Sequence, residues 1–153
     1  MTMLYPSIES LIPHRGNMCL LDRILDYRSN YIEIAAHVQE HAWYLNRAGE
    51  MPSWIALEMM AQAAAAYSGL ERWLDGQTDQ SSRVGMLLGT RELSLLKPTV
   101  AINSELRVIA HQTYRDSAGM GAIQGELWHG DAQIATALLK VYELPADISM
   151  DSL

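Results

Sequence analysis

Glu58 and Gln62 contrast in chemical type with the residues around them. They are four residues apart in the apolar run Met51 to Tyr67, so on a helix they lie on one face, one turn apart. A carboxylate without a partner is costly to bury, and a positioned carboxyl group can give or take a proton in a reaction. The pair therefore indicates a candidate site for acid–base chemistry on an enclosed helix.

The run that carries these two residues has the features of a long helix. Pro52 and Ser53 are typical of a helix start, because proline presets φ and serine can cap a free amide. No glycine or proline follows before Gly69, and we expect the helix to extend from about Ser53 to Leu74. Its surface is apolar nearly all round, which indicates that other structure encloses it. We expect a sheet to wrap around it.

The segments before and after this helix have the patterns of strands. Apolar and polar residues alternate from Ile32 to Val38, which predicts a half-buried strand, and we expect another over Met18–Tyr27. After a polar loop over 75–82, we expect four more strands, at Val84–Leu96, Glu105–Tyr114, Ala122–His129 and Gln133–Leu144. The predicted fold class is therefore α+β, with an antiparallel sheet of about six strands wrapped around one long helix. Pairing with a second chain across a two-fold axis would hide the open edge of such a sheet.

The composition limits the classes of function. With 153 residues the chain is expected to form a single domain, 1–153, that ends in a frayed tail over 144–153. The net charge of −7 argues against a nucleic-acid partner, and a single cysteine, Cys19, excludes an internal disulfide and a cysteine-pair metal site. The most apolar window, Trp54 to Tyr67, is too short to cross a bilayer. We expect a cytoplasmic protein without a metal, a cofactor or a membrane partner.

Several motifs resemble those of one enzyme family. The segment Met51-Pro-Ser-Trp-Ile-Ala-Leu-Glu58, with Gln62 after it, resembles the helix opening of hotdog-fold β-hydroxyacyl-acyl-carrier-protein dehydratases, the FabZ-like family. In that family Met-Pro-Gly begins the helix, and a catalytic Glu or Asp follows at the position of Glu58. Leu11–Arg15 and Cys19–Arg23 are similar to the family's Pro-His-Arg and Leu-Val-Asp-Arg segments. Together with Gly85–Leu93, they look most like the ApeP-type branch, which is associated with aryl polyene biosynthesis.

The resemblance implies a hotdog fold and a reaction. The reaction is dehydration of a 3-hydroxyacyl thioester on an acyl carrier protein to the trans-2-enoyl thioester, with Glu58 as the acid. The family's usual histidine register falls on Tyr44, so His14 is the first candidate for the base and His41 the second. Substrate contacts are expected at the helix start, where the amide groups near Ser53 and Trp54 would face the developing enolate, and at Gln62.

The same resemblance suggests partners, and it leaves alternatives open. We expect an acyl carrier protein as substrate carrier and a homodimer, or a heterodimer with another hotdog subunit. Because the chain and carrier proteins are both acidic, a local basic rim is expected, drawn from Arg15, Arg47, Arg83, Arg91 and Lys97. One alternative is a hotdog thioesterase that acts on acyl-CoA or acyl-carrier substrates. Another is a weakly active partner subunit of a heterodimeric dehydratase.

Overall fold

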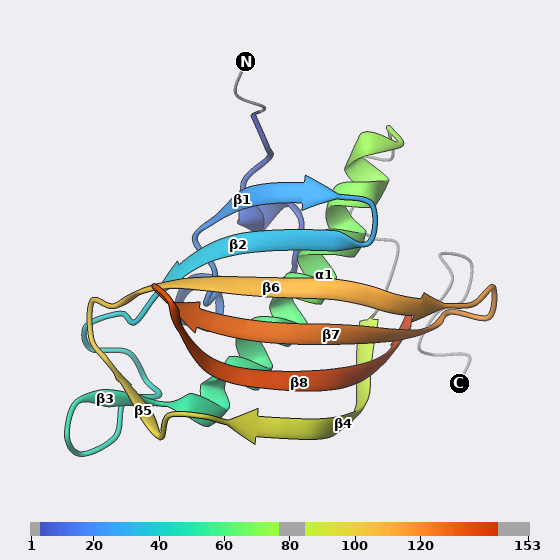
Figure 1. Cartoon of the computed structure of the whole chain (residues 1–153). Helices are drawn as coiled ribbons and strands as arrows, with labels where there is room; N and C mark the ends of the chain where they lie inside the picture. Colours follow the sequence, from blue (N-terminus) through green and yellow to red (C-terminus); the bar gives the residue numbers. More distant parts are fainter. Residues whose placement is uncertain (1–3, 77–84, 144–153) are drawn as a thin grey trace, which may run out of the picture.

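The computed structural model describes residues 4–76 and 85–143 and shows one sheet curved around one long helix (Figure 1). The expected tail over 144–153, most of the loop over 75–82, and Arg83 lie outside the described residues. Two short 3-10 turns, η1 (Ile8–Ser10) and η2 (Gly16–Met18), precede the sheet. No helix among the described residues is long and apolar enough to cross a membrane.

The main sheet has six strands in the order β1-β2-β6-β7-β8-β4, and every neighbouring pair is antiparallel. Its strands are β1 Arg23–Arg28, β2 Tyr31–His37, β4 Gly85–Leu95, β6 Glu105–Arg115, β7 Met120–His129 and β8 Ala132–Glu143. Two short strands, β3 (Glu50–Pro52) and β5 (Thr99–Ala101), pair in a small separate sheet that the sequence did not predict. The predicted α+β class, with a six-stranded antiparallel sheet around one long helix, is confirmed.

The largest differences from the predicted boundaries are at the starts of α1 and β1. The helix α1 spans Ala56–Leu74, because Ser53–Ile55 form a tighter 3-10 turn, η3, before it. The strand expected from Met18 begins only at Arg23 in β1. Before it, Met18 and Leu20 are bonded through their main chain to Gln62 of α1, and the side chains of Leu20 and Leu21 pack into the core.

The helix lies close against the concave face of the sheet and contacts β2, β6, β7 and β8. Gly125 on β7 permits this approach, since a Cβ there would lie 2.6 Å from Met60 Sδ and 3.1 Å from Met60 Cβ. On the opposite side of the helix, Gly69 permits the close approach of the N-terminal segment, because a Cβ at Gly69 would collide with the main-chain carbonyl of Leu11. The helix is therefore held between the sheet and the N-terminal segment.

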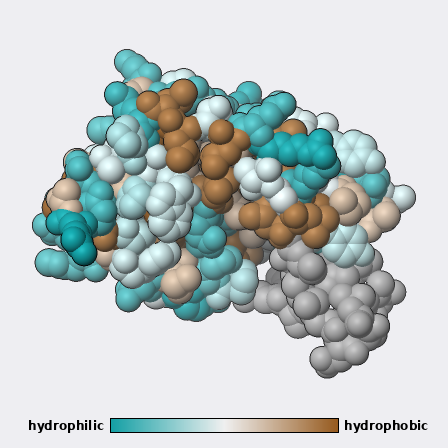
Figure 2. Space-filling view, turned by 90° about the horizontal axis from the view of Figure 1, so that it is seen from below, coloured by the Kyte–Doolittle hydropathy of each residue, from teal (hydrophilic) through white to brown (hydrophobic). Residues whose placement is uncertain are grey.

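The strand β4 lies at an edge of the sheet and pairs only with β8 among the described residues. Two register shifts interrupt this pairing, and Glu92 within the second has a φ of 54°. β4 and the residue after it expose five leucines: Leu87, Leu88, Leu93, Leu95 and Leu96. Apolar surface is visible in the view from below, the side on which β4 lies (Figure 2). The open edge that the sequence predicted is thus present and apolar.

Candidate active site

His14 and Glu58 lie next to each other, with 3.8 Å between His14 Nε2 and Glu58 Oε1. Glu58 is in the first turn of α1, and His14 belongs to the segment between η1 and η2. The gap is longer than a hydrogen bond, as is common for catalytic pairs without a bound substrate. The structure therefore brings together the predicted acid and the first candidate for its base.

Glu58 is more accessible than its apolar sequence context predicted. Its side chain is 44% exposed and that of His14 is 29% exposed. The sheet covers the opposite side of α1, so Glu58 lies on the side of the helix that the sheet leaves open. A ligand can therefore reach both side chains from outside the protein.

The segment Pro13–Leu21, which we call the strap, carries His14. Arg15 shapes it locally, because its guanidinium donates to the carbonyl oxygens of Ile12 at 2.7 Å and His14 at 2.8 Å. His14 Nδ1 is the one buried side-chain polar atom without a hydrogen-bond partner within the described part of the chain. No neighbouring group in that part fixes the ring tautomer through Nδ1, and Nε2 is the nitrogen that faces Glu58.

Gln62 lies one turn behind Glu58, as predicted, and is almost completely buried. Its Oε1 accepts the N–H of Leu20 at 2.9 Å, and its Nε2 donates to the carbonyl of Met18 at 2.7 Å and to Glu58 Oε1 at 3.2 Å. Both amide hydrogens are thus donated within the protein. The amide of Gln62 is therefore engaged with the strap and with Glu58, and its expected contact with substrate stays a prediction.

The helix start contains the amides that were expected to face a developing oxyanion. The N–H of Ser53 is already donated to the carbonyl of Pro98 at 3.0 Å, and the Ser53 side chain is buried. Trp54 N–H is in the first turn, where a helix leaves its N–H groups without acceptors in preceding turns. The Trp54 ring is 55% exposed, one turn before Glu58. Trp54, rather than Ser53, is therefore the residue available to a ligand.

The other histidine candidate and the residue in the family's histidine register are placed differently. His41 is exposed, has a φ of 63°, and forms no ion pair with Glu58. Tyr44 is buried, and its hydroxyl accepts the N–H of Gln39 at 3.2 Å. Burial raises the pKa of Tyr44 above its usual value of 10.0. Neither residue is brought to Glu58 in the way that His14 is.

A second pair of a histidine and a carboxylate lies elsewhere on the sheet. His37 Nδ1 is 2.7 Å from Asp22 Oδ2, closer than His14 is to Glu58. Buried residues alternate with His37 along β2, so this pair lies on the face of the sheet away from α1. It has no helix start beside it, and His37 therefore serves as a control for the site.

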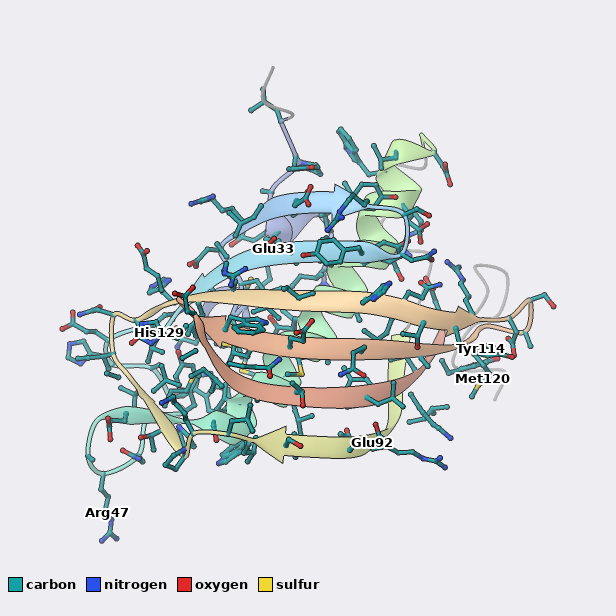
Figure 3. All side chains as sticks on the ribbon, viewed as in Figure 1. Glu33, Arg47, Glu92, Tyr114, Met120 and His129 are labelled. Carbon is teal, nitrogen blue, oxygen red and sulfur yellow. The ribbon has the colours of Figure 1, made fainter. Side chains whose placement is uncertain are left out.

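The described residues contain no group of three histidine, cysteine, aspartate or glutamate side chains that could hold a metal ion. Cys19 is partly buried in the strap, with its Sγ 3.7 Å from the carbonyl oxygen of Leu21. The basic side chains of the expected rim are dispersed over the surface. Arg15 adjoins His14, Arg91 lies on β4 and Lys97 just after it, whereas Arg47 points away from the body of the molecule (Figure 3).

The sequence did not indicate how Trp43 contributes to the site. Trp43 Nε1 donates to the carbonyl of Asn17 at 3.0 Å, so the loop before β3 holds the strap from its exposed side. Trp43 also packs edge-on against Tyr44, with 5.5 Å between ring centroids. Its partner is a main-chain carbonyl, which every residue has, so no sequence pattern could have identified this contact.

Comparison with known proteins identifies the family of this chain. A sequence model of the ApeP-like family, described as ApeP dehydratase, matches residues 6–151. Among curated protein sequences, none matches the chain. Among solved structures, the dehydratase heterocomplex ApeI:P from Xenorhabdus doucetiae contains a chain 28% identical to this one. The TM-score is 0.84, over 92% of this chain and 93% of that chain.

More distant structures share the fold. The E. coli PaaI protein from the phenylacetic acid degradation operon is 14% identical, with a TM-score of 0.58 over 78% of this chain and 81% of that one. A hypothetical thioesterase with coenzyme A from Streptococcus pneumoniae is 11% identical, with a TM-score of 0.61 over 81% and 86% of the two chains. At these identities the likeness shows the hotdog fold alone. The family match covers the strap, the helix and the sheet, and the chain therefore belongs to the ApeP-like family of hotdog-fold dehydratases.

Proposed function

We propose that the chain dehydrates a 3-hydroxyacyl thioester to the trans-2-enoyl thioester, with His14 and Glu58 as its acid–base pair. The observation that carries the proposal is the 3.8 Å approach of these two side chains beside an accessible helix start. Dehydration of such a substrate needs one group that accepts a proton from the α-carbon and another that gives a proton to the β-hydroxyl. A histidine and a carboxylic acid supply this combination.

In the proposed reaction, His14 Nε2 takes the proton from the α-carbon, and the electron pair moves into the thioester as an enolate. The N–H of Trp54 stabilises the enolate oxygen. The enolate then re-forms the carbonyl as the bond between the β-carbon and its hydroxyl breaks, and protonated Glu58 gives that oxygen the proton with which it leaves as water. The proton on His14 returns to Glu58 across the short gap between them, which restores the starting state.

Substitution of each member of the pair tests this reaction. The protein is incubated with a 3-hydroxyacyl thioester while enoyl thioester and free thiol are followed together. We expect Glu58→Gln and His14→Gln each to lower kcat for enoyl formation by about 100-fold or more, because each removes one proton-transfer group. His37→Gln and His41→Gln are controls that keep the wild-type rate. Full activity in His14→Gln would exclude His14 as the base.

Thioester hydrolysis is the second candidate function. The exposed carboxylate of Glu58 supports it, because a water molecule could reach Glu58 and be activated there. The same assay separates the two functions, since hydrolysis releases thiol without forming an enoyl product. A protein that produces neither would fit the remaining alternative, in which the chain is the weakly active subunit of a heterodimeric dehydratase.

We further propose an acyl carrier protein as the carrier of the thioester. Support comes from the exposed basic side chains Arg15, Arg91 and Lys97, of which Arg15 directly follows His14. We expect replacement of all three by glutamine to weaken carrier binding, with a smaller salt dependence of the remaining affinity. Arg47→Gln, which changes a side chain directed away from the body of the molecule, is the control. Unchanged binding by the triple variant would exclude this rim as the docking site.

We also propose that a second hotdog chain, identical or different, pairs with β4. An edge strand that pairs on one side only among the described residues, with five exposed leucines, is a surface that a second sheet could cover. The similarity to a chain of the ApeI:P heterocomplex supports such a partner.

A further inference from the structure

Gln62 is a buried amide that connects two separate parts of the candidate site. Its side chain is 1% exposed, and each of its polar atoms is hydrogen-bonded. Two of the three bonds go to the main chain of the strap, at Met18 and Leu20, and the third goes to Glu58 Oε1. The oxygen that Gln62 holds is the same oxygen that lies 3.8 Å from His14 Nε2.

The strap has few other polar connections to the rest of the protein. Its main-chain hydrogen bonds, from Met18 to Arg15 and from Cys19 to Gly16, are internal, and none joins it to another described element. The side chain of Arg15 donates only to Ile12 and His14 among the described residues. The remaining side-chain connection, from Trp43 to Asn17, is on the exposed side. The buried link between the strap and α1 is therefore Gln62.

We infer that Gln62 is a positioning residue that sets the distance between His14 and Glu58. Because Gln62 is almost completely buried and its amide is bonded to the strap and to Glu58, it acts through the placement of these two side chains. The consequence for catalysis rests on the proposed function, whereas the positioning itself does not. Only a primary amide of this length can accept from Leu20 and donate to both Met18 and Glu58 at once. Glutamate would lose both donors, and asparagine would be one methylene group too short to reach.

Kinetics of Gln62→Glu and Gln62→Asn provide the first test. We expect each variant to lower kcat by about 100-fold with a smaller change in KM, because a displacement of roughly 1 Å between reacting groups costs about that factor. Gln124→Asn, which shortens an amide on the outer face of β7, is the matched control and keeps the wild-type kcat. Thermal unfolding measures the folded fraction of every variant. If kcat falls only in proportion to the folded fraction, the inference is wrong.

A spectroscopic test does not depend on activity. Imidazole nitrogen signals are recorded by NMR on protein with labelled histidine, and the signal of His14 is identified by its loss in His14→Gln. We expect Glu58→Gln to shift the His14 signal in the wild-type background and to shift it far less in a Gln62→Asn background. An equal shift in both backgrounds would overturn the inference. A wild-type protein that forms no enoyl product would refute the proposed function, and this measurement would still decide the role of Gln62.

Discussion

At the scale of single residues, the two oxygens of Glu58 have different surroundings. Oε1 accepts a hydrogen bond from Gln62 and faces His14, whereas no described side chain pairs with Oε2. The protein thus holds the carboxylate by one oxygen, and the side chain as a whole is 44% exposed. This division suits a group that must keep its position while it exchanges a proton with a ligand.

Asp116 provides a residue-scale prediction about pH and stability. Its Oδ1 accepts the N–H groups of Ala118 and Met120, both at 3.0 Å, and its Oδ2 accepts the hydroxyl of Tyr114 at 3.1 Å. Tyr114 and Met120 are on either side of the turn between β6 and β7 (Figure 3). These bonds, that from Met120 above all, hold the pKa of Asp116 below its usual value of 3.8.

Since the folded pKa is the lower one, ionised Asp116 stabilises the fold above pH 3.8, and this stabilisation is lost as the pH falls through the folded value. We therefore expect Asp116→Asn to lower Tm at pH 7 and the difference from wild type to shrink in acid. Tm measured across this range checks the prediction. Asp131→Asn, in the turn between β7 and β8, is the control for a turn aspartate. A Tm difference between wild type and Asp116→Asn that does not change with pH would contradict the stabilising role of ionised Asp116.

At the scale of elements, the N-terminal segment and α1 determine each other's position. Leu11 lies against Gly69 near the C-terminal half of the helix, whereas Met18 and Leu20 are bonded to Gln62 nearer its start. The segment thus contacts the helix over several turns before it enters β1. His14 lies between these contacts, so its place beside Glu58 depends on how the two elements pack.

Gly69→Ala tests this packing. Alanine is favoured over glycine inside a helix by about 1 kcal/mol, but crowding of a well-packed site costs about 1–3 kcal/mol. The atom that a Cβ would meet belongs to the main chain of Leu11, which cannot rotate away as a side chain can. We expect a net loss of up to about 2 kcal/mol in the free energy of unfolding, measured by urea denaturation. Ser68→Ala, at the partly buried adjacent position, is the control and should leave the free energy of unfolding unchanged. A gain in stability for Gly69→Ala would mean that the segment moves away freely.

At the scale of the whole molecule, one helix does not cover the full concave face of a six-stranded sheet. The helix packs on β2, β6, β7 and β8, whereas the leucines of β4 are exposed. The uncovered edge strand is at one side of the molecule, away from the polar outer face of β2. A single chain therefore folds around its core but leaves apolar surface for a partner.

The exposed leucines provide a prediction about assembly. We expect Leu95→Glu to reduce the mass measured by light scattering, either of the chain alone or of its mixture with a second hotdog dehydratase chain. The reason is that a charge on β4 would have to be buried without a partner. Leu74→Glu, an equally exposed leucine at the end of α1, should leave the mass unchanged. Assembly that is unaffected by Leu95→Glu would place the interface elsewhere.

The sequence by itself determined much of this protein. The apolar run with Glu58 and Gln62 predicted the enclosed helix, alternation predicted β2, and the turn residues separated the later strands. The motif residues also indicated the family, which is confirmed, and they predicted Glu58 as the acid. These features are local, because helix and strand patterns depend on neighbours that are close along the chain.

Only the tertiary structure decided how the site is assembled. It placed His14, and not His41, beside Glu58, and it bonded Gln62 to the strap. It also used the N–H of Ser53 for Pro98 and left Trp54 exposed. Each of these outcomes involves a contact between segments distant in the sequence. Several of the partners are main-chain carbonyls or amides, which are present in every residue and have no sequence signature. The residues of the site could therefore be named from the sequence, but their partners depended on the packing of the strap against the helix.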